Sequence, residues 1–183
     1  MPTCHSTNDE LAKMIQENGA EIPEGTVVAT THQTAGRGQR GNHWEAAPGE
    51  NLTFSFLLKP RFLRATDQFR LSIAVALGVH AFLRGHLDEG LKVKWPNDLF
   101  FGDRKLGGLL IENTIQGHSL AESVVGIGIN VTQLRFGVPT ATSLRAAPGQ
   151  PYRYDLDALL VRLLECLEAE YLRLRRGDHE AQK

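Results

Sequence analysis

Residues 91–113 read LKVKWPNDLFFGDRKLGGLLIEN and largely decide the fold. The run LKVKW, residues 91–95, is typical of a strand, and residues 99–113 hold two more strand-like runs around Gly102-Asp103, a dipeptide that favours a tight turn. ESVVGIGINV, residues 122–131, supplies a further run of the same kind. Short connections favour pairing between neighbours, so these segments predict an antiparallel meander.

Further elements complete the predicted layers. TVVATTHQ (26–33) and NLTFSFLL (51–58) predict strands, the second alternating large apolar with mostly polar side chains. Helical spacing of apolar residues predicts a first helix, which begins after a capping box at Ser6 and Thr7 and ends at Asn18-Gly19. The same spacing predicts two longer helices, one over 67–83 with Phe69 in its apolar stripe and one over 155–176. We therefore expect an α+β fold, a mixed and mostly antiparallel sheet with helices covering one face.

Composition limits the classes of function. The chain has 183 residues, of which 42% are hydrophobic and 22% charged, which is enough to bury one core without disulfides or metal. Its net charge of −1 argues against nucleic acid or an anionic membrane as the main partner. The two cysteines, Cys4 and Cys166, lack metal-ligand spacing, so we expect free thiols in the cytoplasm.

A glycine-rich loop follows the predicted strand over 26–33. In QTAGRGQRGNHW, residues 33–44, glycines allow backbone amides to approach a ligand, while Arg37 and Arg40 bring fixed positive charge. This combination suits a phosphate, although an ordinary solvated loop fits the stretch equally well. The loop lacks the Lys-Ser or Lys-Thr of a P-loop and does not open a dinucleotide-binding helix. Trp44 at its end is suited to cover a planar base or to anchor the core.

The meander adds chemically distinctive positions of its own. Asn97 and Asp98 bring oxygen-bearing side chains to a Trp-Pro-Asn-Asp turn, which is also a common Asx-type turn. Lys105 precedes Gly107-Gly108, where the strand backbone is accessible; alone, such a lysine is more often a solvated edge charge. Glycines at 126 and 128 repeat the pattern on the next strand, so the two strands predict a smooth wall for a slim apolar ligand.

Five motifs together resemble biotin protein ligases, the BirA-like enzymes. They are STN (6–8), QTAGRGQRGNHW (33–44), KWPND (94–98), DRKLGGLLIE (103–112) and GIGIN (126–130), in the order and spacing typical of that family. The resemblance covers roughly residues 4–131. It implies a fold related to class II aminoacyl-tRNA synthetases and lipoate ligases.

The resemblance also implies an activity. Biotin and ATP would form biotinyl-5′-AMP and pyrophosphate, and a lysine of a biotin carboxyl carrier domain would then accept the biotinyl group. Mg²⁺ would be carried by ATP, with no metal site made by the protein alone. Lys105 and Arg37 would be the catalytic residues. The residues implied to contact biotin are Ser6, Thr7, Asn8, Gln33, Gly36, Arg37, Gly38, Gln39, Lys105, Gly108, Leu110 and Gly126. Those implied to contact the nucleotide are Arg37, Arg40, Trp44, Asn97, Asp98 and Asn130.

The sequence departs from the family pattern in three respects. Gln39 stands where many members carry a basic residue, so one electrostatic clamp on the adenylate is absent or replaced by Arg40. The other two departures concern domains. We expect a catalytic domain over 1–176 and a polar tail over 177–183, with no DNA-binding domain before the catalytic domain and no β-barrel domain after it. A non-catalytic biotin-binding module and a lipoate or octanoate transferase are the alternatives, and a homodimer is left open.

Overall fold

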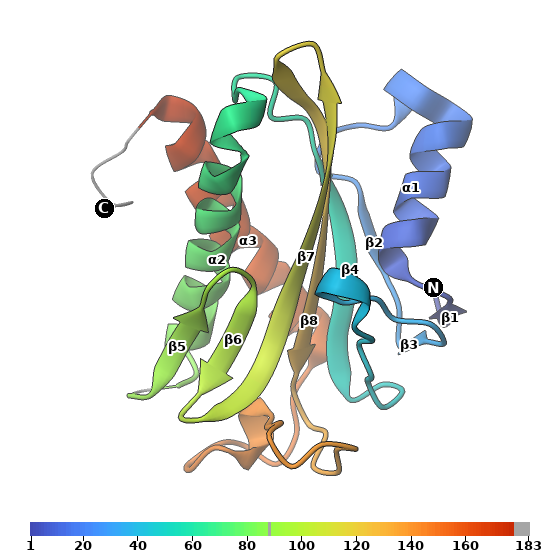
Figure 1. The fold of residues 1–183 in the computed structure, drawn as a ribbon. Coiled ribbons are helices and arrows are strands. Elements are labelled where there is room, and N and C mark those ends of the chain that lie inside the picture. Colours follow the sequence, from blue (N-terminus) through green and yellow to red (C-terminus); the bar gives the residue numbers. More distant parts are fainter. Residues whose placement is uncertain (88, 178–183) are drawn as a thin grey trace.

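The computed structural model describes residues 1–87 and 89–177. Its main sheet has six strands in the order β2-β4-β8-β7-β6-β5, all antiparallel to their neighbours, and β1 and β3 form a separate parallel pair. The strands are β1 (Thr3–Cys4), β2 (Val27–Ala29), β3 (His32–Gln33), β4 (Asn51–Leu58), β5 (Leu91–Lys94), β6 (Asp98–Phe101), β7 (Arg104–Gln116) and β8 (Ser119–Asn130). The predicted α+β class and the meander from β5 to β8 are confirmed (Figure 1).

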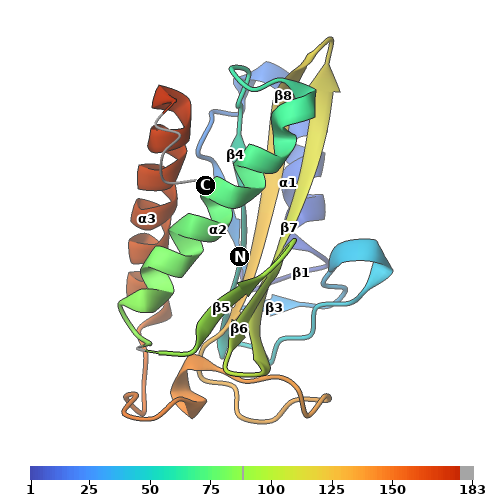
Figure 2. The ribbon, with the colours of Figure 1, turned by 60° about the vertical axis from the view of Figure 1, so that its left-hand side comes forward.

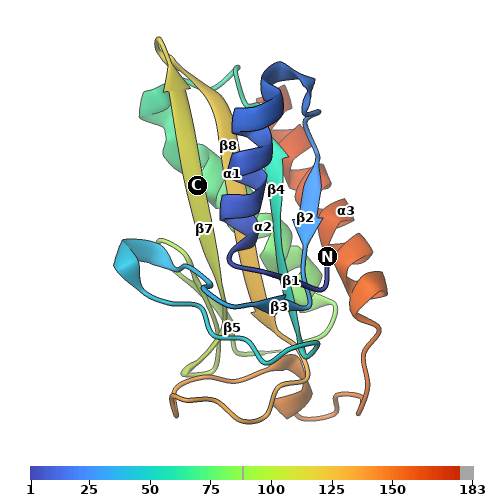
Figure 3. The same cartoon turned by 90° about the vertical axis from the view of Figure 1, so that its right-hand side faces the viewer.

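Within the described residues, three α-helices cover the sheet from both sides. They are α1 (Thr7–Asn18), α2 (Gln68–Arg84) and α3 (Leu156–Arg176), and short 3₁₀ turns occur at Gly19–Glu21, Gln39–Gly41, Ala65–Asp67 and Leu144–Ala146. Helices α2 and α3 pack together on one face (Figure 2), whereas α1 lies across the other face over β4 and β8 (Figure 3). The expectation that the helices cover one face is therefore wrong for α1.

Strand β4 serves both faces of the sheet. Leu52, Phe54, Phe56 and Leu58 point into the main core with α2 and α3. The alternate residues face α1, and Leu57 packs there with Leu11, Val28 and Val124 in a smaller core. All eight residues of β4 are buried, as expected of a strand covered on both sides.

Several local expectations are wrong in detail. The strand expected over 26–33 is broken at Thr30 and Thr31, so β2 joins the main sheet while β3 pairs with β1. Ser6 occupies the N-cap position of α1, but its side chain makes no capping hydrogen bond. Phe69 leaves the buried stripe of α2 and is 44% exposed, because its ring packs edge-on against Trp95 at the surface.

The last helix begins and ends with regular caps. The Asp155 carboxylate accepts hydrogen bonds from the backbone N–H groups of Asp157 and Ala158, and Gly177 ends the helix with a left-handed φ of 79°. The predicted polar tail lies, from residue 178 onward, outside the described residues. Within the described ranges, no helix combines the length and apolar character needed to cross a bilayer.

Candidate functional site

A pocket of about 420 Å³ opens on the α1 side of the sheet, between α1, the loop over residues 36–44 and the β6–β7 hairpin. It gathers most of the predicted site residues from segments that are distant in sequence. Those that line it are Ser6, Thr7, Asn8, Gln33, Arg37, Gly38, Gln39, Arg40, Trp44, Asn97, Asp98, Lys105, Gly108, Leu110 and Gly126. Gly36 and Asn130 are the predicted residues outside its lining.

Strand register explains the floor of the pocket. Thr53 pairs with Gly128 and Ser55 with Gly126, and on the next strand Gly128 pairs with Gly108. Directly paired residues point to the same face of a sheet, so these three glycines lie together under the pocket. A Cβ on Gly126 would lie 2.2 Å from Asn8 Oδ1, which leaves no room for a side chain. The missing side chains therefore give the pocket its depth.

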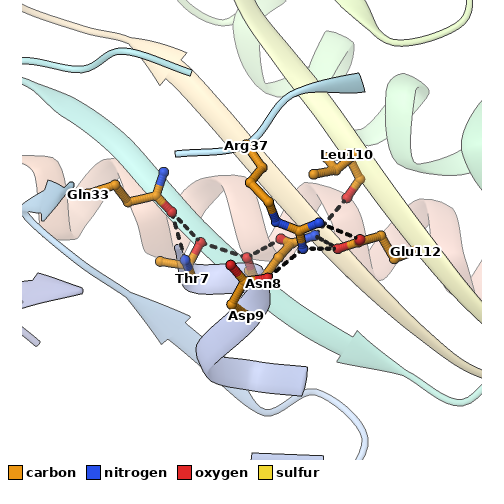
Figure 4. Close-up of polar contacts among 8 residues, drawn as sticks. Thr7, Asn8, Asp9, Gln33, Arg37, Leu110 and Glu112 are labelled. Atoms are coloured by element: carbon orange, nitrogen blue, oxygen red, sulfur yellow. Dashed lines mark hydrogen bonds and ion pairs between the residues drawn. The ribbon is translucent and has the colours of Figure 1, made fainter. Parts of the chain in front are cut away.

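The α1 end of the pocket is a cluster of hydroxyls and amides. Thr7 donates to Gln33 Oε1 from its backbone N–H at 2.7 Å and from its hydroxyl at 3.1 Å. The Ser55 hydroxyl lies 2.7 Å from Thr7 Oγ1 and 2.5 Å from Asn8 Oδ1. These contacts replace the predicted capping box, because the Thr7 hydroxyl is directed to Gln33 (Figure 4). They also fix which side of the Gln33 amide accepts.

The opposite end carries a cation held by a carboxylate. Lys105 Nζ lies 2.7 Å from Asp98 Oδ1, and both side chains line the pocket. A register shift between β6 and β7 pairs Leu99 with Gly107 but Phe100 with Lys105, which leaves Leu106 as an extra residue. This bulge turns Lys105 to the pocket face while Leu106 is fully buried. Lys105 and Asp98 thus form a charged pair on the same wall as Gly108.

The glycine-rich loop is a folded hairpin in this structure. Gly38 N–H donates to Asn42 O at 2.7 Å, and Trp44 N–H donates to Gly36 O at 2.9 Å. Its tip has left-handed backbone at Arg40, with φ of 55°, and at Gly41, with φ of 80°. Gly36 lies at the base of the hairpin, where a Cβ would stand 2.4 Å from Trp44 O. Its role here is close packing, which explains why it does not line the pocket.

Arg37 joins this hairpin to two other elements. Its guanidinium lies 2.7 Å from Asp9 Oδ1 on α1 and pairs with both carboxylate oxygens of Glu112 on β7 (Figure 4). The hydrogen bonds that Arg37 donates to Glu112 raise the pKa of Arg37 above its ordinary value, so the group stays charged. A phosphate that approaches Arg37 must compete with these carboxylates.

The side chains of Trp44 and Asn130 lie against the protein. A Cβ on Gly128 would stand 2.4 Å from Trp44 Cε2, so the indole lies on the pocket floor. Asn130 is 3% exposed, and its Nδ2 donates to Thr142 O at 2.9 Å. It lies outside the lining of the pocket, at the end of β8.

The sequence patterns did not identify some residues of the site. Thr53, Ser55 and Glu112 are the clearest, with Asp9 and Trp95 at the margin. Thr53 and Ser55 lie two residues apart on the pocket face of β4. Glu112 lies on the pocket face of β7, two residues after the predicted Leu110. Strand alternation was the signal that could have found them.

A second concavity, of about 500 Å³, lies across the sheet between α2, α3 and the β2–β4 edge. Its walls are mostly core side chains such as Phe56, Leu58 and Leu71. At its rim the Tyr171 hydroxyl donates to Glu24 Oε1 at 2.7 Å, and burial together with this carboxylate raises the pKa of Tyr171. The pocket under α1 brings polar groups and charges together instead, and is therefore the candidate site.

Comparisons with known proteins find similarity over most of the chain. Residues 2–130 match the biotin/lipoate A/B protein ligase family. The chain is 33% identical over 174 residues to the bifunctional ligase/repressor BirA of Bacillus spizizenii, covering 91% of the chain and 51% of that relative. It is 34% identical over 185 residues to the biotin–[acetyl-CoA-carboxylase] ligase of Mycobacterium tuberculosis, covering 94% of the chain and 63% of that relative.

A solved structure extends the comparison to the fold. The biotin protein ligase from Aquifex aeolicus, in complex with biotin and ATP, has a TM-score of 0.79 and 27% identity, covering 96% of this chain and 70% of that one. The expected biotin ligase-like fold is thereby confirmed. The chain spans about half the length of the first curated relatives that it matches.

Proposed function

The chain belongs to the biotin/lipoate A/B protein ligase family, and from this premise we propose that it activates biotin with ATP and transfers the biotinyl group to a lysine of a biotin carboxyl carrier domain. The observation that carries the proposal is one pocket with two chemically different ends. Hydroxyl and amide groups around Thr7 and Gln33 occupy one end, and Lys105 occupies the other.

The first end suits the ureido ring of biotin. That ring offers two N–H donors and one carbonyl acceptor. Because Thr7 occupies Gln33 Oε1, the Nε2 side of Gln33 can donate to the ring carbonyl, and the Thr7 hydroxyl oxygen can accept from a ring N–H. The glycine floor admits a thin ring system, and Leu110 lines the wall beside Gly126. We assign biotin to this slot, with its carboxylate directed toward Lys105.

The two steps follow from this orientation. A biotin carboxylate oxygen attacks the α-phosphorus of ATP, a new P–O bond forms, and the bond to pyrophosphate breaks. The Lys105 ammonium reduces repulsion between the carboxylate and the phosphates and stabilises the charge that develops on the phosphoryl oxygens. The carrier lysine amine then attacks the acyl carbon, AMP leaves, and the amine proton passes to solvent.

The nucleotide belongs on the Lys105 side of the pocket. We assign Trp44 and Arg40 to the base and phosphates, Asn97 and Asp98 to the phosphate end, and Asn130 to a supporting position beneath it. In the part of the chain that the structure describes, no group of three or more His, Cys, Asp or Glu side chains is arranged to hold a metal ion. We assign Mg²⁺ to the ATP phosphates.

The hairpin over residues 36–44 would cover the adenylate. A mixed anhydride hydrolyses when water reaches it, so a cover over the slot preserves the intermediate until the carrier arrives.

The free thiols of Cys4 and Cys166 are consistent with activity in the cytoplasm.

Pyrophosphate release tests the proposal. The 183-residue protein, given biotin, ATP and Mg²⁺, should release pyrophosphate, and adding a biotin carboxyl carrier domain should yield a biotinylated lysine detectable by mass spectrometry. Lipoate in place of biotin is the matched control for the other branch of the family. Biotin binding without pyrophosphate release would indicate a binding module, and turnover with lipoate alone would assign the chain to that branch.

A further inference from the structure

Glu112 lies on the pocket face of β7, two residues beyond Leu110, and contacts two different elements. Its Oε1 accepts a hydrogen bond from Arg37 Nη1 at 2.9 Å, and its Oε2 accepts from Arg37 Nη2 at 2.7 Å. The same Oε2 accepts from Asn8 Nδ2 at 2.7 Å. One carboxylate on the sheet therefore holds the loop arginine and a residue in the first turn of α1 (Figure 4).

The pairing with Arg37 has directional geometry. Two parallel N–H···O bonds between a guanidinium and a carboxylate fix the plane as well as the position of the arginine. Asp9 adds a contact from α1 to the same Nη2. Single exposed ion pairs contribute little, but here a bidentate pair and a third charge join α1, β7 and the hairpin, elements up to 104 residues apart in the sequence.

The contact with Asn8 fixes the amide of that residue. A carboxylate can only accept, so it selects the Nδ2 side of Asn8 and turns Oδ1 to the Ser55 hydroxyl, 2.5 Å away. In this orientation Asn8 Oδ1 lies over Gly126, on the floor of the slot. Glu112, together with Leu110 O, which accepts from the same Nδ2 at 3.4 Å, thus determines which polar atom of Asn8 faces the floor and which faces the wall.

From these contacts we infer that Glu112 is a positioning residue for the ligand slot: it fixes the Asn8 amide and holds the hairpin against β7 through Arg37. The inference rests on the proposed function for its ligand. A hairpin already held in place loses less conformational freedom when the ligand binds, so Glu112 strengthens binding and retention. It touches neither reacting atom and leaves the chemistry to the Lys105 end.

Glu112→Gln is the direct test because it keeps the shape and removes the charge. We expect biotin to bind about tenfold more weakly by titration calorimetry, from loss of the charge-assisted bonds, and the adenylate to dissociate correspondingly faster. The rate of pyrophosphate release at saturating biotin and ATP should stay within about twofold, since the reacting atoms are unchanged. Glu17→Gln is the matched control: its carboxylate pairs with Lys13 near the far end of α1, at 3.9 Å.

Amide hydrogen exchange without ligand separates this inference from the proposed function. In Glu112→Gln, exchange should become faster over residues 36–44 and stay as in the parent protein over β4. If the parent protein fails to bind biotin, the proposed function falls while the exchange result still tests the positioning role. Unchanged exchange over 36–44 together with unchanged biotin affinity would overturn the inference. So would a large loss of the saturated rate with normal affinity, since that assigns Glu112 to the chemistry.

Arg37→Lys provides a second test, and its single-variant result does not depend on the folding of Glu112→Gln. Lysine keeps the charge but lacks the planar fork, so the bidentate pair with Glu112 is lost. We expect the same faster exchange over residues 36–44 and little further change in the double variant with Glu112→Gln. Full additivity of the two effects would show that the two side chains act independently, contrary to the inference.

Discussion

Replacing Lys105 by alanine should separate catalysis from stability. The Lys105 side chain is 38% exposed, and its ammonium pairs with Asp98 at 2.7 Å on the pocket wall. We expect Lys105→Ala to slow adenylate formation by about 100-fold, because removing a preorganised charge from a developing phosphoryl oxyanion typically costs that much. Folding should be nearly unaffected.

The two effects differ enough in size to be distinguished. A partly exposed ion pair contributes about 0–1 kcal/mol to the free energy of unfolding. A charge 4 Å from a developing charge near a protein surface contributes up to about 4 kcal/mol, and a 100-fold rate loss corresponds to about 2.7 kcal/mol. The catalytic effect should therefore exceed the loss of stability by about 2 kcal/mol.

Single-turnover pyrophosphate release, with saturating biotin and ATP, measures the step directly. Lys92→Ala is the control, because Lys92, on β5 of the same meander, pairs with Asp103 at 3.7 Å but lies outside the pocket. The control should react at the parent rate. If folded Lys105→Ala also releases pyrophosphate within about threefold of the parent rate, the role assigned to Lys105 in this chemistry is refuted.

Three other substitutions test the packing and the pH dependence. Gly128→Ala would place a Cβ 2.4 Å from Trp44 Cε2, so the indole must move and ATP affinity by titration calorimetry should fall by about tenfold; unchanged affinity would exclude Trp44 from the nucleotide site. Gly78→Ala would place a Cβ 2.9 Å from Leu167 Cα, and urea unfolding should show a net loss of about 1–2 kcal/mol from overpacking, against any gain in helix propensity. Burial lowers the pKa of His86 below 6.5, so the native state binds fewer protons than the unfolded chain and stability should fall as the pH drops through 6.5. His86→Gln should flatten that fall, and parallel pH profiles would contradict it.

Local patterns were enough to predict most elements. Strand β4 has the predicted bounds, and α2, α3 and the β5–β8 meander follow their apolar spacing closely. One failure arose where a side chain serves the site. The capping signature at Ser6 and Thr7 was misleading because Thr7 bonds to Gln33, 26 residues away, rather than to its own helix.

The site required information that local patterns do not carry. Gly108 faces the pocket, so regular strand alternation would place the Leu106 side chain in the pocket and the Lys105 side chain in the core. The bulge opposite Leu99 and Phe100 exchanges the faces of these two side chains. The partnership of Arg37 with Glu112 spans 75 residues and depends on the register of three strands. Motif resemblance supplied Lys105 and Arg37 as candidates, but it did not supply their partners.

Successive side chains of β4 point to opposite faces of the sheet, so both the stability of the core and ligand recognition depend on the register of this strand. Even-numbered positions from Leu52 to Leu58 build the core under α2, whereas Thr53 and Ser55 face the pocket. Randomising Thr53 and Ser55 alone would therefore explore ligand preference while leaving the main core, and Leu57 in the smaller core, intact. Deleting one residue from the turn before Asn51 would affect both functions of the strand. If the strand shifted by one position, phenylalanines would fill the pocket and hydroxyls would enter the core, so ligand binding and folding would be lost together.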